Sequence, residues 1–185
     1  MTVTDAAGAP GVSGSNLLLE SRNAGWVRAA ASGDREAFGL LVEAHWAGLV
    51  ALARSVLAGR NEGEDVVQDA LVLAWQRLAT LRDPERFPVW VRRIVVRGCL
   101  RFLRQSRKLS ELPDLMVTPP TGVDRVDLQR ALRMLSPRQR AVMHLTAEGR
   151  SDTEIAGILG IFPSTARVHR SRAARRLRQI LGGEP

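Results

Sequence analysis

Apolar residues recur at spacings of three and four along most of this 185-residue chain, which is the period of an amphipathic helix. The pattern predicts helices over about 24–31, from 34 to Gly59, from about 62 to 78, and from 85 to about 107. Short β-branched runs such as Ile94-Val95-Val96 lie inside the longer helical period, so no strand pattern competes with it. We therefore expect an all-α protein.

Two segments interrupt the helical pattern. Residues 1–23 are rich in Gly, Ala, Ser and Thr and have little apolar surface to bury, so we interpret them as a disordered tail. Residues 109–123 contain three prolines, a glycine and several polar residues, a composition typical of a linker. These breaks divide the rest of the chain into two small helical domains, 24–108 and 124–181.

The second domain has the start and stop signals of a helix-turn-helix. Residues 136–139 and 151–154 each have the spacing of a capping box, in which a serine and a Gln or Glu satisfy the first free amides of a helix. Gly160 tolerates the left-handed conformation of a helix end. Pro163 suits the first turn of the next helix, where its missing N–H is not needed.

This last helix is strongly basic. The net charge of the chain is +8, and Lys108 is the only lysine, so 26 of the 27 cationic residues are arginines. Arginine suits phosphate oxygens and guanine edges, although GC-rich codon usage also favours it, and we infer that both contribute. No acidic residue occurs up to Leu181, and the helix carries Arg167, Arg170, Arg172, Arg175, Arg176 and Arg178. The pattern indicates DNA binding.

In a helix-turn-helix, the N-terminal residues of the last helix lie against base edges in the major groove. The candidates for these contacts are Ser164, Thr165, Arg167, Val168, His169, Ser171, Arg172 and Arg175. We expect Arg167 and Arg172 to contact bases or phosphates, and Arg175 to hold a phosphate or remain solvated. Ala166 and Ala173 fall on the packing side.

A second basic segment runs from Arg86 to Lys108 and interleaves aromatic with cationic residues. An opened duplex needs cations along its backbone and groups that hold bases out of the stack. The candidates are Arg86, Phe87, Trp90, Arg93, Arg97, Arg101 and Arg104. Eight basic residues against Glu85 alone would repel one another on a solvated face, so DNA contact accounts for them better. Phe87 and Trp90 have core packing as their alternative.

Four polar residues near the start of the predicted third helix share one face because they are spaced by three and four. We call them the acidic surface: Glu64, Asp65, Gln68 and Asp69. One interpretation is a solvated helix start, where carboxylates favour the helix dipole. Magnesium ligation in a nuclease is a weaker interpretation, because such sites need carboxylates converging from different elements.

Three stretches, in this order, resemble segments of one protein family. Residues 64–75 (EDVVQDALVLAW) are similar to its region 2.2, and residues 86–94 (RFPVWVRRI) to the start of its promoter-melting segment. Residues 135–140 and 165–178 are similar to its region 4. The chain thus resembles the group IV, or extracytoplasmic-function (ECF), bacterial RNA polymerase sigma factors of the sigma-70 family.

The resemblance implies two helical domains, regions 2 and 4, joined by a flexible linker and bound to core RNA polymerase. It implies that the acidic surface docks on the clamp helices of the largest polymerase subunit. The basic segment would read and open the −10 element as a single strand, and the last helix would read the double-stranded −35 element. It also implies control by an anti-sigma factor that covers these surfaces.

The chain departs from the family pattern at several positions. Arg97 and Arg101 stand where related proteins often have Asn and Asp, so the −10 preference does not carry over. Gly98 costs a helix about 1 kcal/mol relative to alanine. In region 4, Phe162 replaces an expected serine cap and Arg170 an apolar residue.

The sequence offers no candidate for a catalytic or metal site. Cys99 is the only cysteine, which excludes an intramolecular disulfide or a site of several thiolates, and we expect it in the core, with a redox sensor as the minor alternative. The three histidines lack metal-ligand spacing, and no nucleophile–base pair or Walker loop occurs. We expect no cofactor. Apolar runs are far shorter than the ~20 residues of a spanning helix, and no signal-peptide order is present, so we expect a cytoplasmic protein.

Two other classes of function are open at this point. A stand-alone helix-turn-helix regulator would bind DNA without polymerase and would normally dimerise, yet no heptad seam is present, and we expect a monomer. A nucleic-acid enzyme centred on the acidic surface would cleave DNA in a metal-dependent reaction.

Overall fold

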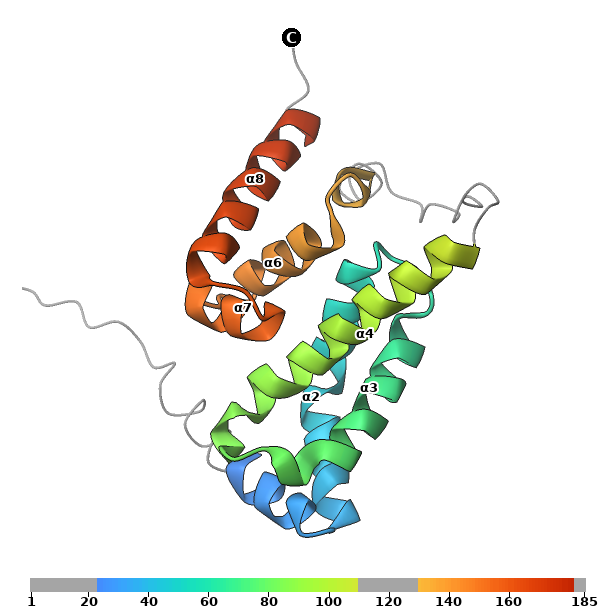
Figure 1. The fold of residues 1–185 in the computed structure, drawn as a ribbon, viewed down its shortest axis with the longest axis vertical. Coiled ribbons are helices and arrows are strands. Elements are labelled where there is room, and N and C mark those ends of the chain that lie inside the picture. Colours follow the sequence, from blue (N-terminus) through green and yellow to red (C-terminus); the bar gives the residue numbers. More distant parts are fainter. Residues whose placement is uncertain (1–22, 110–129, 182–185) are drawn as a thin grey trace, which may run out of the picture.

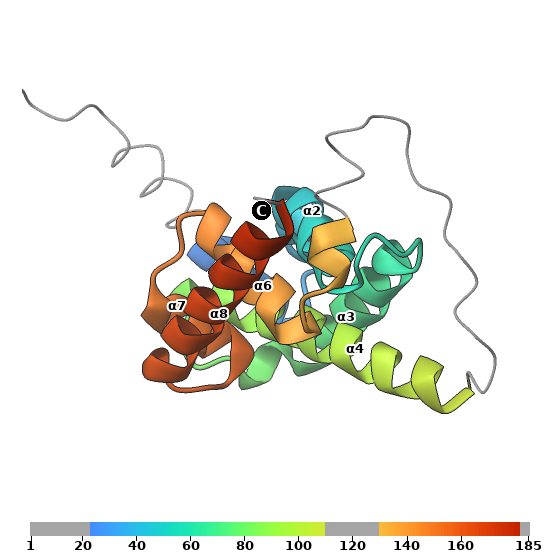
Figure 2. The same cartoon turned by 90° about the horizontal axis from the view of Figure 1, so that it is seen from above.

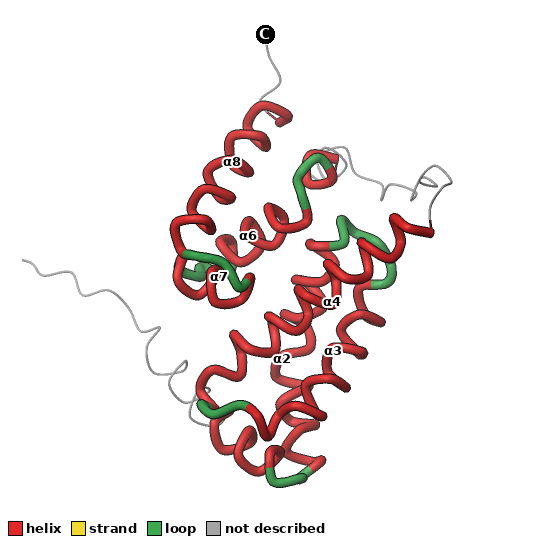
Figure 3. Tube along the Cα trace, viewed as in Figure 1, coloured by secondary structure: helices red, strands yellow, loops and turns green. Residues whose placement is uncertain are grey.

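The computed structural model of the chain describes residues 23–109 and 130–181, and every regular element within these ranges is a helix (Figure 1, Figure 3). The all-α prediction is confirmed. The N-terminal domain consists of a helix over 23–31, α2 (Arg35–Val56), α3 (Gly63–Arg77), the short 3-10 turns η1 (Leu78–Thr80) and η2 (Pro84–Arg86), and α4 (Phe87–Leu109). The C-terminal domain consists of a short helix over 130–133, α6 (Pro137–Ala147), α7 (Asp152–Leu159) and α8 (Pro163–Leu181).

Local chemistry explains where the N-terminal helices begin and end. Asp34 caps α2, because its Oδ1 accepts from the amides of Glu36 at 2.9 Å and Ala37 at 3.0 Å. After α2, Gly59 takes the left-handed conformation with φ of 79°. Asp83 Oδ1 accepts from the Glu85 amide at 3.1 Å, so the fourth helix starts as a 3-10 turn before continuing as α4.

Helices α2, α3 and α4 pack on one another around an aliphatic core. Fully buried members include Leu41, Leu49, Leu52, Val67, Val91 and Val95. Helix α2 is long and apolar enough, by length and composition alone, to cross a membrane. Its buried residues form part of this core.

Gly98 lies at a close approach of α4 to α3. A Cβ at this position would lie 3.1 Å from Val66 Cγ1, which is tighter than ordinary van der Waals contact. The glycine that breaks the local helical preference therefore permits close packing of two helices.

The two domains pack against each other. Helix α6 contacts α2, and α7 contacts α4, so that the apolar residues of both domains form one continuous cluster (Figure 1, Figure 2). The C-terminal contribution includes Val142, Leu145, Ile155 and Ile158. The sequence predicted two linked domains but not this interface.

Several predicted boundaries fall at or beyond the limits of what the structure describes. Asn23, assigned to the tail, is already helical, and Leu109, assigned to the linker, is the last residue of α4. The rest of the predicted tail, most of the predicted linker and the start of the second domain, at 124–129, lie outside the described residues.

Candidate nucleic-acid interface

Reciprocal capping boxes set where α6 and α7 begin. Ser136 Oγ accepts from the Gln139 amide at 3.3 Å, and Gln139 Oε1 accepts from the Ser136 amide at 2.8 Å. Ser151 and Glu154 form the same pair, with 3.3 Å from the Glu154 amide to Ser151 Oγ and 2.9 Å from the Ser151 amide to Glu154 Oε2. Both boxes predicted from the sequence are confirmed.

A sharp turn then directs α8 across α6 and α7. Gly160 is left-handed, with φ of 66°, and its amide donates to Ala156 O at 2.8 Å. Helix α8 begins at Pro163, and the Ala166 amide donates to Phe162 O at 3.0 Å. The predicted helix-turn-helix is therefore present, with α8 as its last helix.

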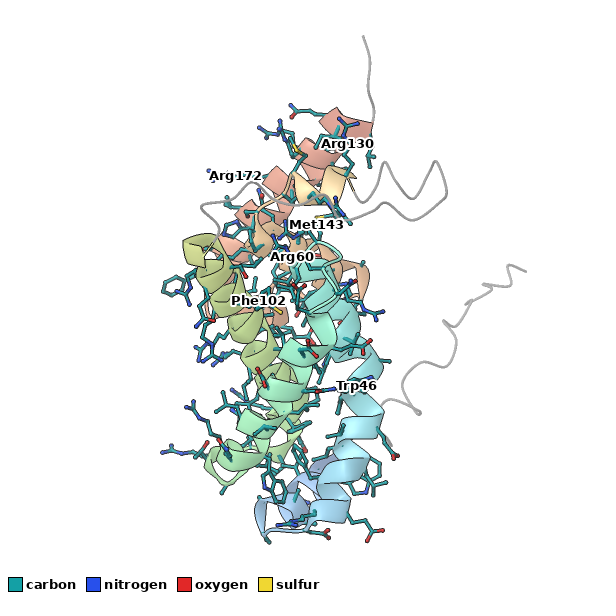
Figure 4. The ribbon with its side chains drawn as sticks, turned by 90° about the vertical axis from the view of Figure 1, so that its right-hand side faces the viewer. Trp46, Arg60, Phe102, Arg130, Met143 and Arg172 are labelled. Atoms are coloured by element: carbon teal, nitrogen blue, oxygen red, sulfur yellow. The ribbon has the colours of Figure 1, made fainter. Side chains whose placement is uncertain are left out.

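Helix α8 has a packed face and an exposed face. Ala166 and Ala173 are fully buried, as expected. We call the exposed candidates the recognition surface: Ser164, Arg167, Val168, Ser171, Arg172 and Arg175. Arg172 lies near the end of the molecule opposite the 23–31 helix (Figure 4). The remaining two candidates, Thr165 and His169, are half-buried.

The surroundings of His169 in the free protein disfavour its charged form. Burial, followed by the positive charges of Arg138 and Arg172, lowers the pKa of its imidazole below the usual value. A neutral imidazole can donate or accept a hydrogen bond but adds no charge to the helix.

Asp152 joins α7 to α8. Its Oδ1 lies 2.7 Å from Arg170 Nη1, and its Oδ2 lies 3.2 Å from Arg170 Nη2. Arg167 Nε lies 3.3 Å from the same Oδ2, but the Arg167 side chain is largely exposed. Of the two contacts of Arg170, only that between Nη2 and Oδ2 is a hydrogen bond, and the 2.7 Å contact between Nη1 and Oδ1 adds attraction between opposite charges. Arg170 therefore holds α8 on α7.

The acidic surface is exposed on the first turns of α3, because all four of its residues face solvent. Glu64 Oε1 lies 2.6 Å from Arg54 Nη2 of α2, and both side chains are largely exposed, so this pair contributes little to stability. Val72 follows on the same face and is 59% exposed. The surface thus combines carboxylates with an apolar side chain.

The candidates on α4 separate into exposed and buried groups. Arg97, Arg101 and Arg104 are exposed and lie on one face, at spacings of four and three. Phe87 is only 1% exposed, with its ring 5.4 Å from that of His45 and 6.0 Å from that of Trp90. Phe87 is therefore a core residue in this structure, and contact with DNA would require its side chain to leave the core.

Two other candidates lie near the start of α4. Trp90 is half-buried, and Figure 4 shows another aromatic residue, Phe102, further along the same helix. Arg86, the last residue of η2, is exposed, and its Nε lies 3.1 Å from Asp83 Oδ2. The ring of Trp90 is thus less accessible to a nucleic acid than the exposed arginines, and Arg86 has an acidic neighbour.

Arg93 contacts the C-terminal domain. Its Nε donates to Gly157 O of α7 at 2.7 Å, and its Nη2 donates to the same oxygen. Gly157 also faces Val89, since a Cβ there would lie 3.5 Å from Val89 Cγ1, and a Cβ at Gly160 would lie 3.8 Å from Arg97 Nη2. In this arrangement α7 covers the first half of α4, and Arg93 is engaged by protein.

Charged groups gather where the domains meet. The Glu148 carboxylate lies 3.7 Å from Arg92 Nε and 3.3 Å from His144 Nε2. Arg150 Nε lies 3.9 Å from the same carboxylate. Burial, and then the charges of Arg92 and Arg150, lower the pKa of His45 to about 4. His45 is therefore neutral near pH 7.

Arg140 is a buried arginine that the sequence reasoning missed. From α6, its Nε and Nη2 donate to Val56 O, at the end of α2, at 2.9 and 2.6 Å. Its Nη1 donates to Leu135 O at 2.7 Å. A cation at a helix C-terminus satisfies carbonyls that lack helical partners. Arg140 therefore ties the two domains together.

The structure gives Cys99 a packing role. The side chain is fully buried, and burial raises the pKa of its thiol to about 12, so it stays protonated. Within residues 23–109 and 130–181, no group of three or more His, Cys, Asp or Glu could hold a metal ion.

Both domains of the chain are similar to those of known proteins. Residues 41–109 match the Sigma-70 region 2 family, and residues 133–179 match the bacterial regulatory proteins of the luxR family. The chain is 33% identical over 171 residues to the ECF RNA polymerase sigma factor SigM of Mycobacterium tuberculosis, and the aligned segment covers 88% of this chain and 86% of SigM. It is 34% identical over 176 residues to the RNA polymerase sigma factor CnrH of Cupriavidus metallidurans, and the aligned segment covers 84% of this chain and 92% of CnrH.

Two solved structures are also similar. The structure of CnrH in complex with the cytosolic domain of CnrY has a TM-score of 0.68 at 30% identity and covers 89% of this chain and 99% of that chain. The structure of the sigma factor RpoE with the anti-sigma factor NepR from Bartonella quintana has a TM-score of 0.66 at 26% identity and covers 80% and 98%. The chain belongs to the ECF RNA polymerase sigma factors.

Proposed function

We propose that this sigma factor binds core RNA polymerase through the acidic surface of α3 and reads the −35 element with the recognition surface of α8. The observation that carries the proposal is the placement of these two surfaces: each is exposed, each has one sign of charge, and they lie on different domains. An acidic face suits a basic protein partner, and an arginine-rich helix suits DNA phosphates and guanine edges. The stand-alone regulator does not account for the N-terminal domain.

For the −10 region we propose a smaller set of contacts than the sequence predicted. Arg97, Arg101 and Arg104 are exposed along one face of α4, where they would hold the backbone of an opened strand. Phe87 is left out because it is buried. Trp90 would need only a modest displacement to stack on a base, since it is already partly exposed.

The packing of α7 on α4 bears on how promoter DNA is engaged. Arg93 uses its Nε and Nη2 on Gly157 O, so fewer of its five N–H donors remain for a phosphate. We expect the C-terminal domain to move off α4 when polymerase and promoter bind. That movement would release Arg93 and uncover the first half of α4.

We also propose a protein inhibitor of the anti-sigma type, which would act on the two-domain arrangement. Its support is the similarity to CnrH and RpoE, whose structures were solved in complex with the cytosolic domain of CnrY and with the anti-sigma factor NepR. We further propose that the chain supplies no catalytic group, that the chemistry belongs to the polymerase, and that the protein acts in the cytoplasm as a monomer when free.

Charge reversal on α3 tests the docking proposal. Asp65→Lys combined with Asp69→Lys should weaken binding to core RNA polymerase at least about tenfold, because like charges across an interface cost several kcal/mol. Glu43→Lys, on an exposed position of α2, is the matched control and should bind normally. Unchanged polymerase affinity in the double variant would remove the acidic surface from the proposal.

A further inference from the structure

Two exposed apolar side chains stand out at the N-terminal end of α8. Phe162, directly before the helix, is 78% exposed, and Val168 is 45% exposed. The exposed positions around them carry Arg167, Arg172 and Arg175, and the other exposed large apolar residue of α8, Leu181, lies at its far end. The buried residues of α8 are instead Ala166 and Ala173.

Phe162 does not serve as a side-chain cap. Helices α6 and α7 of the same domain begin after Ser136 and Ser151, whose hydroxyls accept from amides of the first turn. A phenyl ring has no such acceptor, and only the backbone carbonyl of Phe162 takes part, accepting from the Ala166 amide at 3.0 Å. The exposed ring is therefore not explained by the start of the helix.

Val168 occupies the middle of the recognition surface. It is four residues from Ser164 and four residues from Arg172, so the three side chains follow one another along a single face. Base edges lie opposite such positions in a helix-turn-helix. An apolar side chain there meets the groove floor without a hydrogen-bonding group.

The chemistry that suits apolar side chains in the major groove is the C5-methyl group of thymine, the one apolar feature that distinguishes base pairs there. A protein partner is a poorer match, because α8 carries six arginines and no carboxylate, and a helix with this charge suits DNA phosphates. We propose that Phe162 and Val168 each recognise the methyl group of a thymine in the −35 element. This inference rests on the proposed function of α8.

Removing single methyl groups from the DNA tests this directly. The −35 duplex would be obtained by selecting a random duplex library with the full-length protein and core RNA polymerase. Each thymine would then be replaced in turn by deoxyuridine, and the dissociation constants of the full-length protein would be measured by fluorescence anisotropy. At two positions the wild-type protein should bind about fourfold more weakly, the value of one methyl group buried at about 0.8 kcal/mol.

Protein variants then test which side chain contacts each thymine methyl group. Phe162→Ser should abolish the thymine preference at one of these positions and Val168→Ser at the other, each leaving the remaining preference intact. Met134→Ser is the matched control, because Met134 is 58% exposed in the same domain but lies outside α8. It should leave every thymine-to-deoxyuridine ratio unchanged.

The outcomes separate this inference from the proposed function. Specific binding with no thymine preference at any position, or with preferences that neither variant alters, overturns the inference alone. A variant that keeps all preferences overturns the role of that residue. Loss of polymerase binding in either variant, with thymine preference retained, assigns the side chain to a protein contact and overturns its proposed role. Failure to select any duplex overturns the proposed function and the inference together.

Discussion

Arg140→Met should lower the free energy of unfolding by about 3 kcal/mol. Methionine keeps the unbranched apolar stem of the side chain but removes the donors to Val56 O and Leu135 O. Each buried carbonyl left without its partner costs about 1–3 kcal/mol, or about 2–6 kcal/mol for two. Relief of the burial penalty of the guanidinium offsets part of this loss, which leaves about 3 kcal/mol.

Urea unfolding would measure the effect with two signals. At an m-value of about 2 kcal/mol/M, a loss of 3 kcal/mol lowers the midpoint by about 1.5 M. Far-ultraviolet circular dichroism reports both domains, whereas tryptophan fluorescence reports the N-terminal domain, which contains all four tryptophans. The two curves should coincide in the wild-type protein and separate in the variant, because the link between α6 and α2 is lost.

Arg138→Met provides the control on the same helix, because Arg138 is exposed. It should change stability by no more than about 0.5 kcal/mol. If Arg140→Met behaved like this control, Arg140 would not stabilise the packed arrangement of the two domains, and the reasoning from its buried hydrogen bonds would be refuted.

Three further predictions concern other parts of the molecule. His45 has its pKa lowered to about 4 from an ordinary value of 6.5, so the unfolded chain takes up the proton first and the free energy of unfolding falls as pH falls from 6.5 towards 4. Between pH 7 and 5, the free energy of unfolding of His45→Gln, measured by urea titration, should therefore fall by about 2 kcal/mol less than that of the wild type. Equal losses in the two proteins would contradict the assignment. Gly98→Ala should leave the free energy of unfolding nearly unchanged, because about 1 kcal/mol of helix preference offsets a tight contact with α3. Gly98→Leu should lower it by about 2 kcal/mol in the same assay. Equal effects of the two substitutions would refute the close approach of the helices. Arg175→Ala should reduce the slope of log DNA affinity against log salt concentration by about 0.9 without changing the midpoint of thermal unfolding. Arg170→Ala, which breaks the pair with Asp152, should lower that midpoint. The reverse pattern would exchange the roles of the two arginines.

Elements with local causes were predictable from the sequence. The capping boxes at Ser136 and Ser151, the left-handed turn at Gly160 and the start of α8 at Pro163 each depend on residues within a few positions of one another. Short-range hydrogen bonds and backbone preferences suffice to define them. For the same reason the packed and exposed faces of α8 were predictable, through the buried Ala166 and the arginines opposite it.

Features that depend on distant parts of the chain were not predictable. Arg93 and Gly157 are 64 residues apart, and Arg140 and Val56 are 84 residues apart. No local pattern distinguishes these arginines from those that face solvent, since the acceptor is a backbone carbonyl that every residue has. The burial of Phe87 was similarly undecided, because an aromatic residue between arginines suits both a core and a base-stacking site.

Run-off transcription is the most direct test of the central claim that this chain is a promoter-specific sigma factor. Purified protein and core RNA polymerase would be incubated with a fragmented genomic library, and the 5′ ends of the RNA would be mapped. The account predicts discrete start sites that share two upstream sequence motifs, both absent when the protein is omitted. Absence of any transcript from a protein that still binds DNA by itself would contradict it.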